Sequence, residues 1–378
     1  MAVVMSRYRR QPAQQMRGRE NMDWTAIHAQ ATANMTEAGL QYEDGNADID
    51  GGHRDIDTLA WRRFGILPRA FHNVGDIDTS VTIGGRTIST PIFGAPTAYH
   101  RLASKNGEIT SQNGMDRAGT FIVYPTNASE PVEHFAAEAQ GDWWQQVYLF
   151  DNHKVSEAFI ERSVASGAKA LMLTLDCPGY RRDFGFRNGI DGTWEGASGN
   201  FPDMHMTDWT LNLATSITPK DIQWLKEISG LPVYVKGVMR PEDAVTAMNA
   251  GAAGVMVSNH GRRQVDGVVP VAYALPRIRR ALGRDAEIFA DTGIRTGGDV
   301  FRALALGANA VGLGRPIQWA AAAGGEDGIT KMIERITDEL AHTMNSAGVS
   351  RIADIDESFL VEGQGPSAVL SGVHGIAA

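Results

Sequence analysis

Cysteine is nearly absent from this sequence of 378 residues, which contains only Cys177. A single cysteine cannot form an intrachain disulfide bond, so folding needs no oxidising compartment and a cytoplasmic location is predicted. No apolar run approaches the ~18 to 20 residues that cross a bilayer, so we expect no membrane partner. Basic residues are outnumbered, with 35 Lys and Arg against 44 Asp and Glu and a net charge of -9. Nucleic-acid-binding proteins usually carry a basic stripe, so no nucleic-acid partner is expected.

The two ends of the sequence differ from its middle. Residues 1–21 carry five arginines but lack the apolar segment of a signal peptide. We predict a flexible N-terminal arm there, with a transit peptide as the alternative. Hydrophobic residues make up 43% of the chain and charged residues 21%, as in ordinary globular proteins. We predict one folded domain over residues 22–350 and a mobile, Gly- and Ser-rich C-terminal tail over residues 351–378.

Short apolar runs that resemble β-strands alternate with helical stretches from residue 91 onward. This alternation is typical of βα units and a parallel sheet. Because there are eight such runs, they predict an α/β fold of the closed (β/α)8 TIM-barrel type rather than an open sheet. The runs cover residues 91–95, 120–124, 145–149, 169–174, 232–236, 254–258, 287–291 and 309–313.

Segments outside the repeats are also predicted. Residues 24–39 have the pattern of a helix, and residues 41–57 form an acidic loop. A long insertion follows the fourth strand, and we expect it to be a lid loop over about residues 177–218, because barrel enzymes keep their active sites at this end of the strands. Residues 324–348 are predicted to form a final long helix.

Polar side chains stand at the carboxyl ends of six predicted strands. Taken alone, Gln146 or Tyr148 would be ordinary barrel-interior residues, and Lys236 could be a lysine of the rim. Barrel interiors are mostly filled by Val, Ile and Leu, so the whole set indicates a catalytic or binding site at this rim. The set comprises Gln146, Tyr148, Thr174, Asp176, Lys236, Ser258, His260, Asp291, Arg295 and Arg315.

The loops after the last two strands combine glycines with arginines. Gly293, Gly297, Gly298, Gly312 and Gly314 allow backbone N–H groups to approach a ligand, and Arg295 with Arg315 supplies positive charge, so we predict a phosphate site. The alternative is that the glycines only turn the chain. Asp291 would either hold Arg295 or bind ligand hydroxyl groups.

The run Ser258-Asn-His-Gly-Arg-Arg-Gln-Val-Asp266 resembles the signature of FMN-dependent 2-hydroxy-acid oxidases and dehydrogenases, which act on glycolate, lactate or mandelate. Shorter matches to the same family follow the chain in order, and the likeness spans residues 24–348. They lie at residues 95–98, 146–148, 174–176, 235–237, 291–295 and 314–316.

The resemblance implies FMN as cofactor and a role for each matching residue. His260 would be the catalytic base, which suits an imidazole that titrates near neutral pH, and Asp176 would stabilise the imidazolium. Lys236 would stabilise negative charge on the flavin. Arg263, Arg182, Tyr148 and Tyr42 would bind substrate, with Arg181 as the alternative to Arg182. The remaining cofactor contacts would come from Ala95, Pro96, Thr97, Gln146, Thr174, Ser258, Asp291, Gly293, Arg295, Gly314 and Arg315, and no metal is expected.

Three residues depart from the family pattern. Tyr124 and Pro125 stand where a small hydroxyl residue is usual, and we expect them to change a flavin contact. Arg262 replaces a Gly or Ala and is expected to change the substrate mouth. The tyrosine of the N-terminal loop matches Tyr42 only with a small shift, because Gln41-Tyr-Glu-Asp-Gly45 replaces an Ala- and Gly-rich stretch.

The resulting hypothesis is oxidation of a small 2-hydroxy acid, lactate-like or aryl and mandelate-like, to the 2-oxo acid. Dioxygen or another acceptor would take the electrons, and transfer of the α-hydrogen as hydride or as proton stays open. The departures from the pattern favour, as an alternative, a tailoring oxidase acting on a biosynthetic or carrier-attached intermediate. A non-catalytic FMN-binding protein is the third hypothesis. The family also implies a homo-oligomer, a tetramer.

Overall fold

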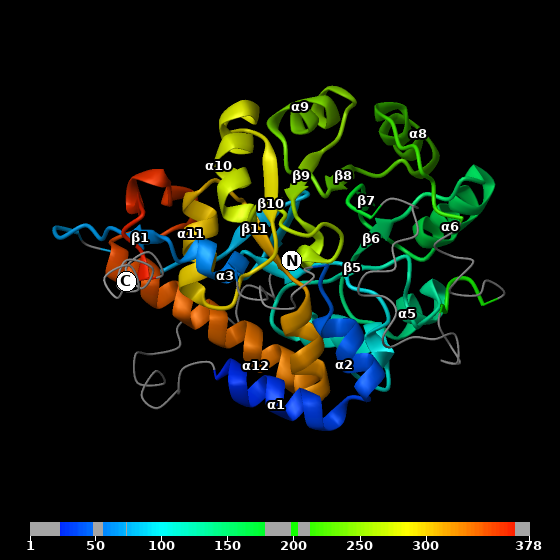
Figure 1. Ribbon diagram of the computed structural model, residues 1–378, viewed down its shortest axis with the longest axis horizontal. Helices are drawn as coiled ribbons and strands as arrows, with labels where there is room; N and C mark the ends of the chain where they lie inside the picture. Colours follow the sequence, from blue (N-terminus) through cyan, green and yellow to red (C-terminus); the bar gives the residue numbers. More distant parts are fainter. Residues whose placement is uncertain (1–22, 48–55, 73, 178–197, 203–211, 367–378) are drawn as a thin grey trace.

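The computed structural model describes residues 23–47, 56–72, 74–177, 198–202 and 212–366. The predicted arm, Arg181, Arg182 and most of the predicted lid loop lie outside these residues. Figure 1 shows a central set of strands surrounded by helices, with α1 (Trp24–Asn34) lying along α12 (Arg315–Ala347).

In the described part of the chain, eight strands form one parallel sheet in the order β4-β11-β10-β9-β8-β7-β6-β5. A parallel bridge between Gly94 and Ile122 joins the two outer strands, and the Gly94 N–H donates to the Phe121 carbonyl at 2.8 Å. The sheet therefore closes into the predicted (β/α)8 barrel. The strands are β4 (Ile92–Gly94), β5 (Val123–Tyr124), β6 (Trp144–Val147), β7 (Leu171–Thr174), β8 (Val233–Lys236), β9 (Gly254–Val257), β10 (Glu287–Ala290) and β11 (Ala310–Leu313).

Helices follow the strands and begin at local capping signals. Thr218 and Asp221 form a capping box at the start of α8, and Thr296 and Asp299 form another at the start of α11. These reciprocal hydrogen bonds satisfy backbone N–H groups that the first helical turn leaves unpaired. The surrounding helices are α4 (Gly107–Arg117), α5 (Val132–Glu138), α6 (His153–Ala165), α8 (Pro219–Ser229), α9 (Pro241–Asn249), α10 (Val271–Leu282), α11 (Gly297–Ala305) and α12.

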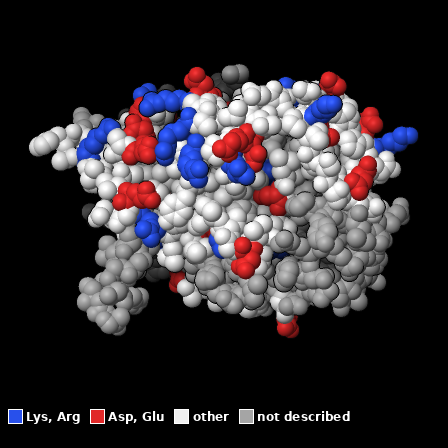
Figure 2. Space-filling model, turned by 45° about the horizontal axis from the view of Figure 1, so that its top comes forward, with Lys and Arg blue, Asp and Glu red and all other residues white. Residues whose placement is uncertain are grey.

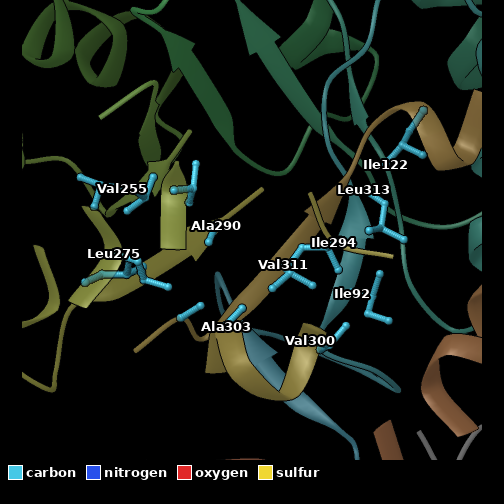
Figure 3. Close-up of a cluster of buried hydrophobic side chains, with 14 of the residues drawn as sticks. Ile92, Ile122, Val255, Leu275, Ala290, Ile294, Val300, Ala303, Val311 and Leu313 are labelled. Carbon is cyan, nitrogen blue, oxygen red and sulfur yellow. The ribbon is translucent and has the colours of Figure 1, made fainter. Parts of the chain in front are cut away.

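The main hydrophobic core lies between the strands and this ring of helices. Val255, Ala290 and Val311 lie on adjacent strands, and Figure 3 shows them in one cluster with side chains of the helices. Leu275 of α10 and Val300 of α11 belong to the same buried cluster. Because successive side chains of a strand point to opposite faces, the residues between these positions face the barrel interior.

The barrel interior has an apolar layer and a polar layer. Near the amino ends of the strands, buried aromatic residues fill it, and the hairpin of β2 (Val81–Ile83) and β3 (Arg86–Ile88) contributes Ile83 and Ile88 to the same cluster. Two residues further along five strands the inward positions are polar. The apolar layer includes Phe93, Phe121, Trp144, Tyr234 and Phe289, and the polar layer includes Gln146, Thr174, Lys236, Ser258 and Asp291.

The N-terminal region differs from the prediction of one helix over residues 24–39. The structure has α1, α2 (Glu37–Asp44) and α3 (Ile56–Trp61). The helix is interrupted at Thr36, because the Thr36 side chain accepts a hydrogen bond from the Gly39 N–H and caps the start of α2. Part of the predicted acidic loop over residues 41–57 is therefore helical.

The C-terminal region is more extensively packed than predicted. The final helix begins at Arg315 rather than at residue 324, and its backbone departs from helical geometry at Gly324 and Gly325. Beyond it, β12 (Leu360–Glu362) pairs with β1 (Phe64–Ile66), and the Phe359 side chain is buried. Residues 351–366 therefore pack against the domain instead of forming a mobile tail, while residues 367–378 lie outside the described residues.

The surface shows no strong separation of charge on the face drawn in Figure 2, where basic and acidic side chains lie among one another. Among the helices of the described ranges, none is both long enough and apolar enough to cross a bilayer.

Candidate active site

Three ionisable side chains meet at the carboxyl ends of neighbouring strands. Asp176 follows β7, Lys236 ends β8, and His260 follows β9. The Nδ1 atom of His260 lies 2.8 Å from Oδ1 of Asp176, and Nζ of Lys236 donates to Oδ2 of Asp176 at 2.9 Å. Nζ of Lys236 also lies 3.5 Å from Nδ1 of His260. The structure thus brings the predicted base, carboxylate and ammonium into one cluster.

Burial and mutual charge set the protonation states of this cluster. Burial alone would raise the pKa of Asp176, but Lys236 and His260 hold that pKa well below its ordinary value. Burial lowers the pKa of His260, and Asp176 only partly opposes this effect. The pKa of Lys236 is raised, because the carboxylates of Asp176 and Asp291 outweigh its burial. At neutral pH the imidazole is therefore neutral, between a carboxylate and an ammonium.

The tautomer of His260 follows from its partner. An ionised carboxylate only accepts hydrogen bonds, so the Nδ1 atom that faces Asp176 carries the hydrogen. The Nε2 atom then carries the lone pair, as a proton acceptor requires.

Polar side chains of four strands continue the rim beside this cluster. The Ser258 hydroxyl donates to Oδ2 of Asp291 at 3.0 Å and accepts from the His260 N–H at 3.1 Å. On the other side, Nε2 of Gln146 donates to the Thr174 hydroxyl at 3.1 Å. These four side chains are buried, so their orientation is fixed by one another and by the strands that carry them.

The segment after β4 lies against the last strand of the barrel. The N–H of Ala95 donates to the Leu313 carbonyl at 2.9 Å, which extends the pairing of β4 with β11. After Pro96, the Thr97 hydroxyl lies 2.7 Å from Nε2 of His100 and accepts from Nε2 of Gln318 at 2.9 Å. Residues 95–97 are thereby held at the rim.

The guanidinium groups of Arg263, Arg295 and Arg315 gather beyond the ends of β9, β10 and β11. Nη2 of Arg315 donates to the carbonyl oxygens of Gly261 and Gly45, and the guanidinium of Arg295 lies 5.2 Å from the centre of the Trp319 ring. Burial, together with the charges of Arg263 and Arg295, lowers the pKa of Arg315 to about 10. Partly buried cations that repel one another form a site with a preference for an anion.

The start of α12 adds to this preference. Its N-cap residue is Gly314, and the helix runs from Arg315 to the break in helical geometry at Gly324 and Gly325. The first backbone N–H groups of a helix and its dipole favour a bound anion. A side chain at Gly314 would place its Cβ 3.2 Å from the Thr97 side chain, so the backbone of this turn lies close to the segment after β4.

Aromatic side chains line the side of the rim near the N-terminal helices. The Arg263 guanidinium lies 4.8 Å from the centre of the Tyr42 ring and donates to the Tyr42 carbonyl at 2.7 Å. The rings of Tyr42 and Tyr99 make an edge contact with centroids 5.6 Å apart. Burial raises the pKa of Tyr148, and its hydroxyl hydrogen-bonds with Cys177, next to Asp176. Arg263, Tyr42 and Tyr148 therefore all lie near the ionisable cluster.

Comparison with known proteins agrees with this geometry. The FMN-dependent dehydrogenase family matches residues 31–362. A 2-hydroxyacid oxidase of Dictyostelium discoideum is 36% identical over 330 residues, which cover 82% of this chain and 84% of the relative. An L-lactate oxidase of Lactobacillus jensenii is 35% identical over 85% of this chain and 80% of its own. A crystal structure of mandelate oxidase superposes with a TM-score of 0.81 at 31% identity, covering 89% and 97% of the two chains.

This chain belongs to the FMN-dependent dehydrogenase family. The family's cofactor fits the residues present: the gathered guanidinium groups and the start of α12 suit a phosphate, and the polar rim with the Lys236 ammonium suits the polar edge of a flavin ring.

The family pattern led us to expect an altered flavin contact at Tyr124 and Pro125. For Tyr124 the structure contradicts this expectation. Tyr124 faces outward into the core between the barrel and the helices, where it contacts Phe135. Its hydroxyl donates to the Glu130 carbonyl at 2.5 Å and accepts from Nδ2 of Asn200 at 3.0 Å. The strand alternation thus turns this ring away from the barrel interior.

The expectation that Arg262 changes the substrate mouth is also wrong. Its side chain is buried, and Nη1 lies 3.6 Å from Oδ2 of Asp57 in α3.

Two of the glycines assigned to phosphate have packing reasons of their own. A Cβ at Gly293 would come within 2.6 Å of the Asp57 backbone, and one at Gly297 within 2.1 Å of the Leu340 backbone.

Two buried acids near the site were not found from the sequence. Glu43 is 3% exposed and its Oε1 has no hydrogen-bond partner among the described residues; burial raises its pKa to about 8, although Arg263 and Arg315 oppose this. Asp57 is 1% exposed. Both lie in the segment predicted as an acidic loop, residues 41–57, where carboxylates are ordinary. Only the departure from the Ala- and Gly-rich family pattern around Tyr42 could have drawn attention to Glu43.

Proposed function

We propose that this chain oxidises a small 2-hydroxy acid to the corresponding 2-oxo acid, with His260 as base and FMN as the first electron acceptor. The observation that carries the proposal is the contact between His260 and Asp176, whose Nδ1 and Oδ1 atoms lie 2.8 Å apart at the rim. The lowered pKa of each group agrees with a neutral imidazole beside an ionised carboxylate. The names of the relatives, which include 2-hydroxyacid and lactate oxidases, support the substrate class.

The proton leaves the substrate toward Nε2 of His260. Because Nδ1–H already donates to Asp176, the imidazolium that forms keeps this hydrogen bond. The bond then joins a cation to an anion, which strengthens it. The low pKa of Asp176 keeps it ionised throughout, so it stabilises the imidazolium without taking the proton itself. His260 is the base whether the α-hydrogen leaves as hydride or as proton.

The substrate carboxylate is assigned to Arg263. Backbone carbonyls of residues 42, 43 and 45 and the Tyr42 ring hold its guanidinium beside His260. A planar guanidinium can bind a carboxylate through two hydrogen bonds, which fixes the substrate carbon relative to Nε2. The resemblance adds Arg182, which lies outside the described residues, and Tyr148 and Tyr42 as hydrogen-bond donors.

FMN, when bound, supplies a ring system that accepts two electrons. Lys236 provides a fixed positive charge for the reduced state, and its raised pKa keeps it charged. Residues 95–97 would lie beneath the ring, and Gln146, Thr174 and Ser258 would bind its edges. Arg295 and Arg315, with the turns at Gly293 and Gly314, would hold the phosphate, and Asp291 would keep Ser258 in place through its 3.0 Å hydrogen bond.

Anaerobic mixing tests the proposal. The FMN-loaded protein is mixed with glycolate, lactate, mandelate and 4-hydroxymandelate, and the flavin absorbance is followed. Bleaching by at least one of these acids, with appearance of the 2-oxo acid, is the expected result. An absence of bleaching by all four would refute the proposal for small 2-hydroxy acids. Peroxide release in air then decides between dioxygen and another acceptor.

The two alternative functions have less support. The tailoring hypothesis depended on Tyr124, Pro125 and Arg262, but Tyr124 faces the outer core and Arg262 is buried against Asp57. A non-catalytic FMN-binding protein would not need the His260–Asp176 pair. The cytoplasmic location and the tetramer stay predictions.

A further inference from the structure

The loop that carries His260 has an unusual backbone. His260, Gly261 and Arg262 have φ values of 56°, 63° and 61°, so three successive residues are left-handed. Glycine adopts this conformation freely, but residues with a Cβ do so at an energetic cost. Such a conformation persists only where the surroundings enforce it, so contacts outside the loop must hold His260 in place.

Asp57 of α3 supplies contacts to both ends of this loop. Its Oδ1 accepts from Nδ2 of Asn259 at 2.9 Å and from the Val271 N–H at 3.2 Å. Asn259 in turn accepts from the Arg262 N–H through its own Oδ1 at 3.3 Å. One buried carboxylate therefore fixes the residue before His260 and the residue that begins α10.

Arg262 contacts both Asp57 and the part of the loop that follows His260. Its Nη1 donates to the Val268 carbonyl at 2.9 Å and lies 3.6 Å from Oδ2 of Asp57, an oxygen without a hydrogen bond among the described residues. The Arg262 carbonyl accepts from the Ala47 N–H at 2.8 Å. The side chains of Arg262 and Asp57 are 4% and 2% exposed, so the pair is desolvated, and Arg262 is the cation that Oδ2 of Asp57 faces.

The same helix holds the neighbouring loop after β10. The Thr58 hydroxyl donates to the Gly293 carbonyl at 2.8 Å, and the Trp61 indole N–H donates to the Thr292 carbonyl at 2.8 Å. The Thr292 hydroxyl accepts from the Gly261 N–H at 3.2 Å, inside the His260 loop. The short helix α3 thus connects two active-site loops that are far from it in the sequence.

We propose that the buried Asp57–Arg262 pair is a positioning device that holds the His260 loop in its left-handed conformation, so that Nδ1 of His260 meets Asp176. Neither residue contacts the ionisable cluster, so the pair acts through His260. The inference rests on the proposed role of His260 as base. It predicts that the two charges are coupled: removing either one takes a charged partner from a desolvated side chain, whereas removing both takes away the charge and its partner together.

Two single variants and their combination test this dependence in the FMN-loaded protein. Asp57→Asn keeps an acceptor for Asn259 but removes the charge, and Arg262→Gly removes the guanidinium from a backbone that glycine tolerates. We expect each single variant to lower the rate of flavin reduction at saturating 2-hydroxy acid by about 10- to 100-fold, as a misplaced catalytic group does. Half-saturating substrate and FMN affinity should change much less, and the double variant should recover most of the rate.

A matched control separates positioning from general loss of stability. Ile333→Ala creates a cavity in α12, which packs against α4 away from this loop, and it should lower the melting temperature without a comparable loss of reduction rate. If Ile333→Ala slows reduction as much as the single variants do, or if the double variant is no faster than the slower single variant, the proposal is wrong.

A second measurement needs no substrate and so separates this proposal from the proposed function. Backbone N–H groups of residues 260–263 are hydrogen-bonded within the loop and to its neighbours. Hydrogen exchange of a peptide spanning residues 258–263 should be faster in each single variant and restored in the double variant. Unchanged exchange in the single variants would overturn the positioning role even if no 2-hydroxy acid reduces the wild-type flavin.

Discussion

The two layers of the barrel interior are built by the same strands and differ in nearly every property. Tyr234 and Lys236 lie two residues apart on β8, and Phe289 and Asp291 lie two residues apart where β10 ends, so each pair shares a face. In the first layer the rings of Phe93, Trp144 and Phe289 contact one another, with centroids 5.4 to 6.5 Å apart. In the second layer, buried charges and hydroxyl groups replace them.

This difference shows that the apolar layer of the barrel mainly stabilises the fold, whereas the polar layer mainly serves the chemistry. Burial of aromatic rings stabilises the closed barrel, because apolar area leaves water and the rings pack closely. The second layer holds Asp176, Lys236 and Asp291 in a desolvated site, which stabilises the fold little, since desolvation offsets the attraction between buried charges. Substitutions in the two layers should therefore affect different measurements.

The largest effect is expected for His260→Ala. Removing the base should slow flavin reduction by about 10²- to 10⁴-fold, the usual contribution of general base catalysis, with little change in melting temperature or FMN content. Stopped-flow reduction under anaerobic conditions measures the rate, and release of FMN on denaturation measures its content. Turnover equal to wild type would show that another group is the base.

Phe289→Ala tests the role of the apolar layer in stability. Truncating a fully buried ring of the apolar layer should lower the free energy of unfolding by about 3–5 kcal/mol through lost burial and a residual cavity. Well below its melting temperature, the variant should still reduce its flavin at a rate near wild type. Denaturant titration gives the stability. A loss of rate comparable with that of His260→Ala would remove the distinction between the layers.

Glu43→Gln measures how much a buried carboxylate near the polar layer destabilises the fold. The folded protein raises the pKa of Glu43 from 4.5 to about 8, so between these values it binds a proton that the unfolded chain has lost. The free energy of unfolding therefore falls as pH rises through this window, and the variant escapes the loss. Its advantage over wild type at pH near 8 should be on the order of a few kcal/mol in the FMN-free protein.

The measurement for Glu43→Gln is thermal unfolding at pH near 5 and near 8. The exposed Glu161 on α6 provides the matched control, Glu161→Gln, which should show the same pH dependence as wild type. A constant difference between Glu43→Gln and wild type at both pH values would mean that Glu43 does not titrate in this window.

The smallest effect is expected for Tyr124→Phe. The substitution removes a hydroxyl that hydrogen-bonds with Glu130 and Asn200, outside the barrel. We expect a loss of about 1 kcal/mol in the free energy of unfolding and an unchanged flavin spectrum. A shifted spectrum would reinstate the flavin contact that the family pattern implied for this position.

The strand runs were predictable from the sequence because their signal is local. Seven of the eight runs contain the observed strand in full, and β6 begins at Trp144, one residue before its run. Polar residues at the ends of the runs gather because parallel strands of a barrel present their carboxyl ends at one rim. Helix boundaries near the N-terminus were less predictable, because the break at Thr36 depends on one capping hydrogen bond. Arg262 was misjudged because its orientation depends on what packs around it, whereas the outward direction of Tyr124 follows from strand alternation.

By itself the sequence determined the repeat of strands and helices, the polar character of the strand ends and the signature around His260. These features follow from side-chain periodicity and from residues that are adjacent in the chain. Only the tertiary structure decided that Asp57 hydrogen-bonds with Asn259, 202 residues away, and that Glu43 lies buried among arginines. The reason is physical: such contacts depend on which distant segments share a desolvated space, and no local pattern records that.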